Sequence, residues 1–96
     1  MHDHNIWLEF ACHDLQAAQI LIDNDYPLIQ PALVLAQQAA EKALKAYLFY
    51  ENNPPIKTHD LVKLVNICET FDSDFKQLLE AASQLAPHIS ISRYPD

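Results

Sequence analysis

Glycine is absent from this chain of 96 residues. At the average usage of about 7%, a chain of this length would hold roughly seven glycines. A P-loop, a Rossmann dinucleotide fingerprint and a nucleophile elbow all need glycine where the backbone turns sharply or approaches a phosphate, so the sequence excludes all three. Tight hairpin turns also lose their preferred residue. These absences favour a helical chain interrupted by proline.

Positive charge is scarce as well, because 6 Lys+Arg stand against 13 Asp+Glu and give a net charge of -7. Broad electrostatic binding to nucleic acid or to an anionic membrane requires a cationic surface, which this composition does not supply. Any contact with RNA or a nucleotide therefore has to be local. No run approaches the roughly 20 apolar residues of a membrane span, and we expect no membrane partner.

Cysteine occurs only at Cys12 and Cys68, without CxxC spacing. Neither lies at the N-terminus of a predicted helix, which is the position that activates a thiol. Cys68 falls on an apolar helix stripe, and we expect it to pack in the core. No signal peptide or long apolar run precedes the two cysteines, so the sequence favours a reduced, cytoplasmic protein.

Metal-binding patterns are missing too, because the sequence has neither HExxH nor ExxH. Glu9 and His13 share a helix face at i and i+4, but two ligands do not make a site. His2 and His4 lie at a terminus that is expected to fray. We therefore expect no metal and no cofactor.

Apolar residues recur at helical spacing along the first half of the chain. Residues 5–24 form the first predicted helix, which buries one face. Residues 31–51 form the second, which is rich in alanine and leucine, the strongest helix formers. Pro31 suits its first turn, where the missing N–H costs nothing. The first predicted helix carries an apolar stripe of Trp7, Phe10, Ala11, Leu15, Ala18, Leu21 and Ile22.

Two shorter helices are predicted in the second half. Thr58 is the expected N-cap of the third, with Asp60 in its first turn, and this helix extends to about residue 70. A fourth begins near residue 73 or 74 and ends before Pro87, and residues 88–96 form an extended tail. The fold class is therefore all-α, an up-and-down bundle of four helices.

The size of the chain supports one domain over residues 1–96. Surface scaling predicts that a chain of this mass buries about 65% of its unfolded surface, which leaves little margin for a stable core. A small helical domain with a broad apolar stripe often completes its core against another subunit.

The second predicted helix carries neighbouring amides and alternating charges at Gln37, Gln38, Glu41, Lys42 and Lys45. Gln38 with Lys42, and Glu41 with Lys45, stand at i and i+4 and suit a solvated helix edge. Glutamines near a lysine can also hydrogen-bond a base or a phosphate. Both interpretations stay open, and the nucleotide-binding candidates are Gln38, Lys42 and Lys45.

The segment 57–60 places His59 at the start of a helix, next to unpaired backbone N–H groups. Such an N-terminus can hold an anion, and a histidine can exchange a proton near neutral pH. A capping turn with His59 packed locally is the alternative. Arg93 is the only arginine; it suits a phosphate or base contact, and it equally suits a pair with a carboxylate.

Five sequence blocks together resemble the HEPN domain family over nearly the whole chain: Trp7, residues 14–15 (DL), 36–46 (AQQAAEKALKA), 57–61 (KTHDL) and 93–96 (RYPD). The resemblance implies an α-helical bundle of four or five helices, usually a homodimer. Small stand-alone members are often paired with a minimal nucleotidyltransferase in a two-component toxin–antitoxin system.

Many HEPN proteins are metal-independent ribonucleases, and their motif is an arginine followed four to six residues later by a histidine. The resemblance implies that Arg93 would stabilise the phosphorane charge while a histidine, His59 or His88, moves protons. Here only three residues follow Arg93, and His88 precedes it by five, so the motif is incomplete. The chain also ends where relatives usually continue into a last helix.

These observations favour a dimeric interaction or nucleotide-binding subunit of a nucleotidyltransferase–HEPN pair. Arg93 belongs to both candidate sets, the nucleotide-binding and the catalytic one. The competing function is a ribonuclease toxin with Arg93, His59 and His88 as catalytic residues.

Overall fold

The structure, a computed structural model, describes residues 4–80, 82 and 83. This part of the chain holds three α-helices and a 3₁₀ helix and no strand: α1 (His4–Ile22), α2 (Ile29–Tyr50), α3 (Leu61–Glu69) and η1 (Ser73–Leu78). The predicted all-α helical bundle is confirmed.

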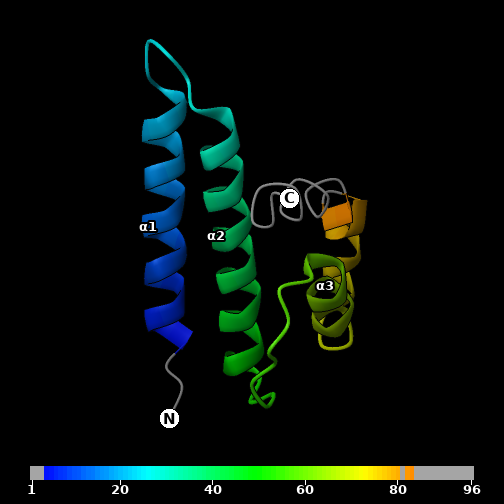
Figure 1. Cartoon of the computed structure of the whole chain (residues 1–96). Coiled ribbons are helices and arrows are strands. Elements are labelled where there is room, and N and C mark those ends of the chain that lie inside the picture. Colours follow the sequence, from blue (N-terminus) through cyan, green and yellow to red (C-terminus); the bar gives the residue numbers. More distant parts are fainter. Residues whose placement is uncertain (1–3, 81, 84–96) are drawn as a thin grey trace.

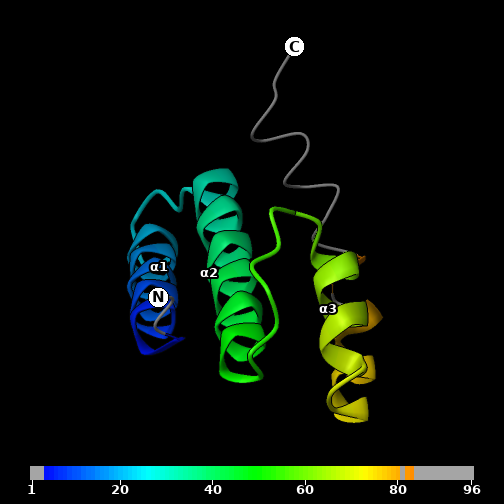
Figure 2. The same cartoon turned by 90° about the horizontal axis from the view of Figure 1, so that it is seen from below.

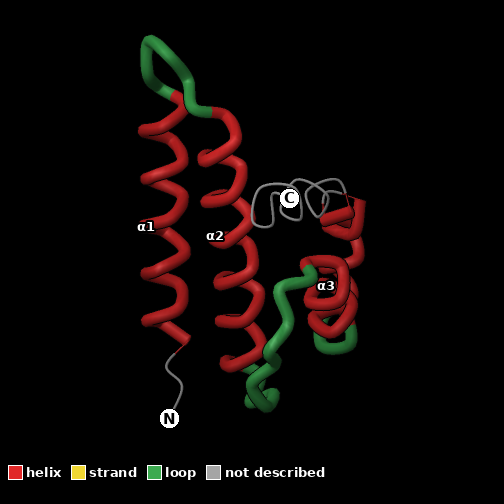
Figure 3. Tube along the Cα trace, in the orientation of Figure 1, coloured by secondary structure: helices red, strands yellow, loops and turns green. Residues whose placement is uncertain are grey.

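The first two helices form an antiparallel pair, side by side along their length (Figure 1). α3 lies on the other side of α2, where it runs across α2, and η1 packs against α3 (Figure 2). Within the described residues α1 contacts no helix except α2. A loop of residues 51–60, which we call the connector, joins α2 to α3 (Figure 3). None of the described helices is long and apolar enough to cross a bilayer.

The turn between α1 and α2 explains the small shift in the predicted helix ends. α1 ends at Ile22 rather than at residue 24. The Asn24 side chain accepts a hydrogen bond from the backbone N–H of Tyr26, which favours a turn over a further helical residue. α2 begins at Ile29, so Pro31 lies in its first turn as predicted.

The predicted N-cap of the third helix is wrong by two residues. Asp60 is the N-cap of α3, because its side chain accepts from the backbone N–H groups of Val62 and Lys63 at 3.0 and 3.3 Å. The Thr58 hydroxyl instead accepts from the backbone N–H of Asp60 at 3.1 Å, which fixes the turn before the helix.

The fourth predicted helix begins as η1, with Asp72 as its N-cap. The backbone is α-helical again at residues 79, 80, 82 and 83. Pro87 and the predicted tail at residues 88–96 lie outside the described residues.

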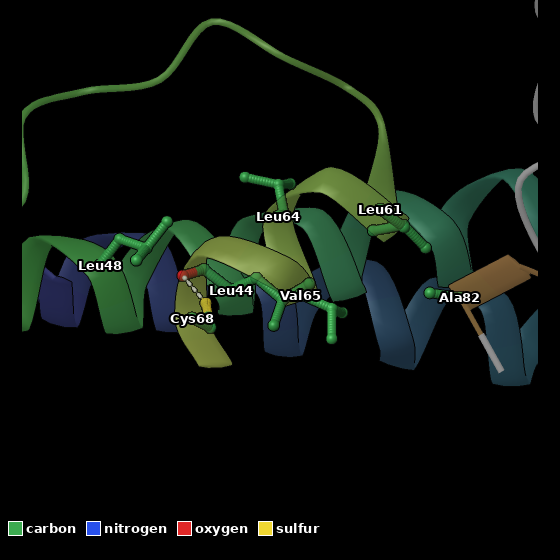
Figure 4. Close-up of a cluster of buried hydrophobic side chains, with 7 residues drawn as sticks. All are labelled: Leu44, Leu48, Leu61, Leu64, Val65, Cys68 and Ala82. Atoms are coloured by element: carbon green, nitrogen blue, oxygen red, sulfur yellow. Dashed lines mark hydrogen bonds between the residues drawn. The ribbon is translucent and has the colours of Figure 1, made fainter. Parts of the chain in front are cut away.

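The hydrophobic core lies between α2 and α3 (Figure 4). Leu64 and Cys68 are fully buried there, and the Cys68 thiol donates a weak hydrogen bond to the backbone carbonyl of Leu44 at 3.7 Å. Burial raises the pKa of Cys68 to about 11, so the thiol stays neutral at physiological pH. The prediction that Cys68 is a core residue is confirmed. The cluster consists of Leu44, Leu48, Leu61, Leu64, Val65, Cys68 and Ala82.

The apolar stripe of α1 is covered less than the sequence predicts. Only Ala11 and Ala18 are buried, whereas Phe10, Leu15 and Ile22 remain about half exposed. A pair of helices buries only the narrow strip along which they touch, and alanines on both sides let α1 and α2 approach closely. The apolar residues beside that strip therefore stay exposed to water unless another surface covers them.

Candidate functional site

A buried ion-pair cluster joins α2 to the connector. The Glu41 carboxylate oxygen Oε2 accepts a hydrogen bond from Lys45 Nζ at 3.3 Å and lies 2.7 Å from His59 Nδ1. Glu41 and Lys45 are one helical turn apart, and both are buried. The predicted Glu41–Lys45 pair is confirmed. The interpretation as a solvated helix edge is wrong for these two residues, because both lie on the side of α2 that faces the connector and α3.

Gln37, which the sequence places among the neighbouring amides but not among the candidate site residues, is 1% exposed and anchors the connector from the same face of α2. Its Nε2 donates to the backbone carbonyl of His59 at 3.4 Å. The signal was present in the spacing, because Gln37 and Glu41 continue the helical stripe of Leu44 and Leu48, which are core residues. Polar residues on an apolar stripe indicate buried polar contacts.

Two interpretations were open for His59, an anion-binding helix N-terminus and a capping turn with His59 packed locally. The structure shows the capping turn, because the Asp60 side chain accepts from the backbone N–H groups of Val62 and Lys63 and so occupies the groups that an anion would need. Glu41 orients the imidazole instead. The His59 side chain is 60% exposed, and Glu41 holds only Nδ1, which leaves Nε2 free to exchange a proton with a ligand.

A hollow of about 320 Å³ lies next to His59, between the connector, the start of α1 and the end of α2. Its basic side chains are Lys45, Lys57 and His59, and its aromatic wall is formed by Trp7 and Phe49, whose ring centroids are 5.5 Å apart. Pro55 and Ile56 complete the lining. Basic side chains beside an aromatic wall suit a phosphate that carries a planar ring.

A family model of the HEPN domain matches residues 4–96. This chain belongs to the HEPN family. No curated protein and no solved structure matches it.

The other nucleotide-binding candidates of this HEPN domain lie beside the hollow but do not line it. Lys42 forms an ion pair with Asp14 of α1, with 2.7 Å between Nζ and Oδ2, and its Nζ lies 5.9 Å from the centroid of the Phe10 ring. Gln38 stands at i−4 from Lys42 and shares that flank of α2. Of the three α2 candidates, the structure brings Lys45 alone to His59.

Two further catalytic candidates of the HEPN domain, Arg93 and His88, lie outside the described residues, as does His2. In the described part of the chain no group of three or more His, Cys, Asp and Glu side chains could hold a metal ion. Glu9 and His13 are exposed on α1, and Cys12 is an exposed free thiol.

Proposed function

We propose that this HEPN domain is the nucleotide-binding subunit of a two-component system, acting as a homodimer together with a minimal nucleotidyltransferase. The observation that carries the proposal is the hollow beside His59, which combines cationic side chains with an aromatic wall. In this function Lys57 and His59 bind phosphate oxygens, Lys45 contributes its charge from the buried pair with Glu41, and Trp7 stacks on the base. The HEPN resemblance supports the nucleotidyltransferase partner.

The electrostatics of the chain limit the ligand to a short one. At a net charge of -7 the domain repels a long polyanion, whereas Lys57 and the other basic side chains of the hollow can still attract a mononucleotide. The exposed apolar residues of α1 support the homodimer, because half-exposed leucine and phenylalanine side chains gain free energy when a partner covers them.

Fluorescence of Trp7, the only tryptophan, reports directly on the hollow. Titration of the full chain with AMP and ATP is expected to change this fluorescence, and Lys57→Ala is expected to weaken binding about tenfold through loss of one charge-assisted contact. Lys63→Ala is the matched control, since Lys63 is exposed on α3 and does not line the hollow. Equal affinities of the two variants, or no binding by wild type, would contradict the proposal.

The nucleotidyltransferase partnership is tested by co-expression with a nucleotidyltransferase from the neighbouring gene. Tight co-purification is the expected result. A chain that stays alone through chromatography at low micromolar concentration would contradict this part of the proposal.

The alternative function is a metal-independent ribonuclease, which the His59–Glu41 contact specifically favours. A histidine oriented by a buried carboxylate can serve as a general acid or base, and Arg93 would stabilise the negative charge of the transition state. Under this alternative the wild type cleaves end-labelled RNA in excess EDTA, and both His59→Ala and Arg93→Ala abolish cleavage. His13→Ala, at an exposed histidine of α1, is the control that keeps activity. Absence of cleavage by wild type would exclude this function.

A further inference from the structure

The contact between His59 and Glu41 fixes which ring nitrogen of His59 carries the hydrogen. Nδ1 lies 2.7 Å from Oε2 of Glu41, and the same oxygen accepts a hydrogen bond from the Lys45 ammonium group at 3.3 Å. Glu41 therefore takes part in this cluster as a carboxylate, which has no hydrogen to donate. Nδ1 must supply the hydrogen of the short contact, and in the neutral ring Nε2 is left as an acceptor.

Glu41 can hold the His59 ring in both of its charge states. Its other oxygen, Oε1, is buried and has no hydrogen-bond donor among the described residues, so its polar contacts there are made through Oε2 alone. The Nδ1–H group donates to Oε2 whether or not Nε2 carries a proton. A change in the charge of the ring therefore alters only what Nε2 offers to the hollow that His59 lines.

The other charged groups near His59 come from α2, the connector and the cap of α3. Lys45 and Lys57 line the hollow, whereas α1 contributes Trp7 and no charged side chain to the part of this lining that the structure describes. The Asp60 carboxylate accepts from two backbone N–H groups in the first turn of α3. Because Lys45 is already paired within the ion-pair cluster, Lys57 and the His59 ring are the groups that a phosphate can contact.

We propose that His59 makes the hollow selective for a phosphate monoester such as AMP, which binds with uptake of one proton at Nε2; this rests on the nucleotide-binding function proposed above. The lone pair of a neutral Nε2 repels a phosphate oxygen, whereas a protonated Nε2 donates a charge-assisted hydrogen bond to it. A nucleoside without phosphate offers hydroxyl donors, which a neutral Nε2 accepts. Binding of AMP therefore transfers one proton from the solvent to His59, and binding of adenosine transfers none.

The direction of the pH dependence follows from this proton uptake. Histidine changes charge between about pH 5 and 8, so the affinity for AMP is expected to rise as the pH falls through the upper part of this range. The gain ends near about pH 6, where a phosphate monoester itself loses its second negative charge. Lysine side chains keep their charge throughout this range and so do not contribute to the pH dependence.

Calorimetric titration of the full chain with AMP, repeated in buffers of different ionisation enthalpy at about pH 7.5, counts the protons taken up. Wild type is expected to take up between about half a proton and one proton per AMP, and none with adenosine. His59→Gln keeps an N–H donor at a similar reach but cannot titrate, so its proton uptake is expected to vanish. His13→Gln, at an exposed histidine of α1, is the matched control and is expected to keep the wild-type value.

The pH profile of AMP affinity provides a second readout through Trp7 fluorescence. Between about pH 8.5 and pH 6.5, the Kd of wild type is expected to fall about tenfold or more, while that of His59→Gln stays constant. Circular dichroism of each variant reports whether it folds. Nitrogen NMR of the wild-type histidine rings needs no variant: in the free protein at about pH 8, Nδ1 of His59 is expected to be protonated and Nε2 unprotonated, and AMP is expected to protonate Nε2.

The outcomes separate this inference from the proposed function. Binding of AMP without proton uptake, or uptake that persists in His59→Gln, would overturn the inference while nucleotide binding stands. An unprotonated Nδ1 in the free protein would also overturn it, because the role of Nε2 depends on that hydrogen. Absence of AMP binding by wild type would overturn both.

Discussion

A Glu41→Leu variant is expected to lose about 3–5 kcal/mol of unfolding free energy, because it removes one partner of a buried ion pair. Lys45 is only 9% exposed, and without Glu41 its ammonium group stays in the interior with no counter-charge. The connector also loses the contact between Glu41 and the His59 ring. Urea denaturation followed by circular dichroism measures the change.

Two controls show whether the ion pair is the cause. The double variant Glu41→Leu with Lys45→Met removes both charges and is expected to recover most of the lost stability, since an apolar pair of similar volume suits this interior. Glu9→Leu changes an exposed glutamate of α1 and is expected to shift stability by less than about 0.5 kcal/mol. A single Glu41→Leu variant as stable as Glu9→Leu would show that the cluster does not hold the connector.

Leu64→Ala is expected to cost about 2–5 kcal/mol, which is a large share of the stability of a domain this small. Leu64 is fully buried in the core cluster between α2 and α3, and truncation leaves a cavity that rigid helices fill only in part (Figure 4). Thermal and urea unfolding of the purified variant provide the measurement.

Ile20→Ala is the matched control for this truncation, because Ile20 is 70% exposed. Its expected cost is below about 0.5 kcal/mol. Similar losses in the Leu64 and Ile20 variants would contradict the placement of the core between α2 and α3.

Helical periodicity predicted the elements of the fold well, because α1 and α2 carry long apolar patterns and α2 is rich in alanine. It did not predict which residue caps α3. Thr58 and Asp60 are both good N-caps, and the choice depends on the path of the connector, which Gln37 and Glu41 hold from a distant part of the chain. The spacing of Gln37 and Glu41 indicates that they make buried polar contacts, but it does not show that the connector is their partner.

The candidate site was predicted in part for the same reason. His59 and Lys45 were selected by residue type and spacing, and they do meet at Glu41. Trp7 and Lys57 line the hollow only because the folded chain brings the start of α1 beside the connector, which the local sequence does not show. The exposed stripe of α1 was not predicted for a similar reason. Periodicity predicts that a helix face is apolar, but it does not identify the surface that covers that face.

The connector links two cavities of this HEPN domain through consecutive residues. His59, which borders the hollow, is followed directly by the α3 cap Asp60 and then by Leu61, which lines a groove between α2 and the α3–η1 unit. Because Asp60 holds the first turn of α3, any displacement of the His59 backbone is passed to that turn and to the Leu61 side chain. The shape of the hollow and the packing of α3 on α2 are therefore coupled through three residues of chain.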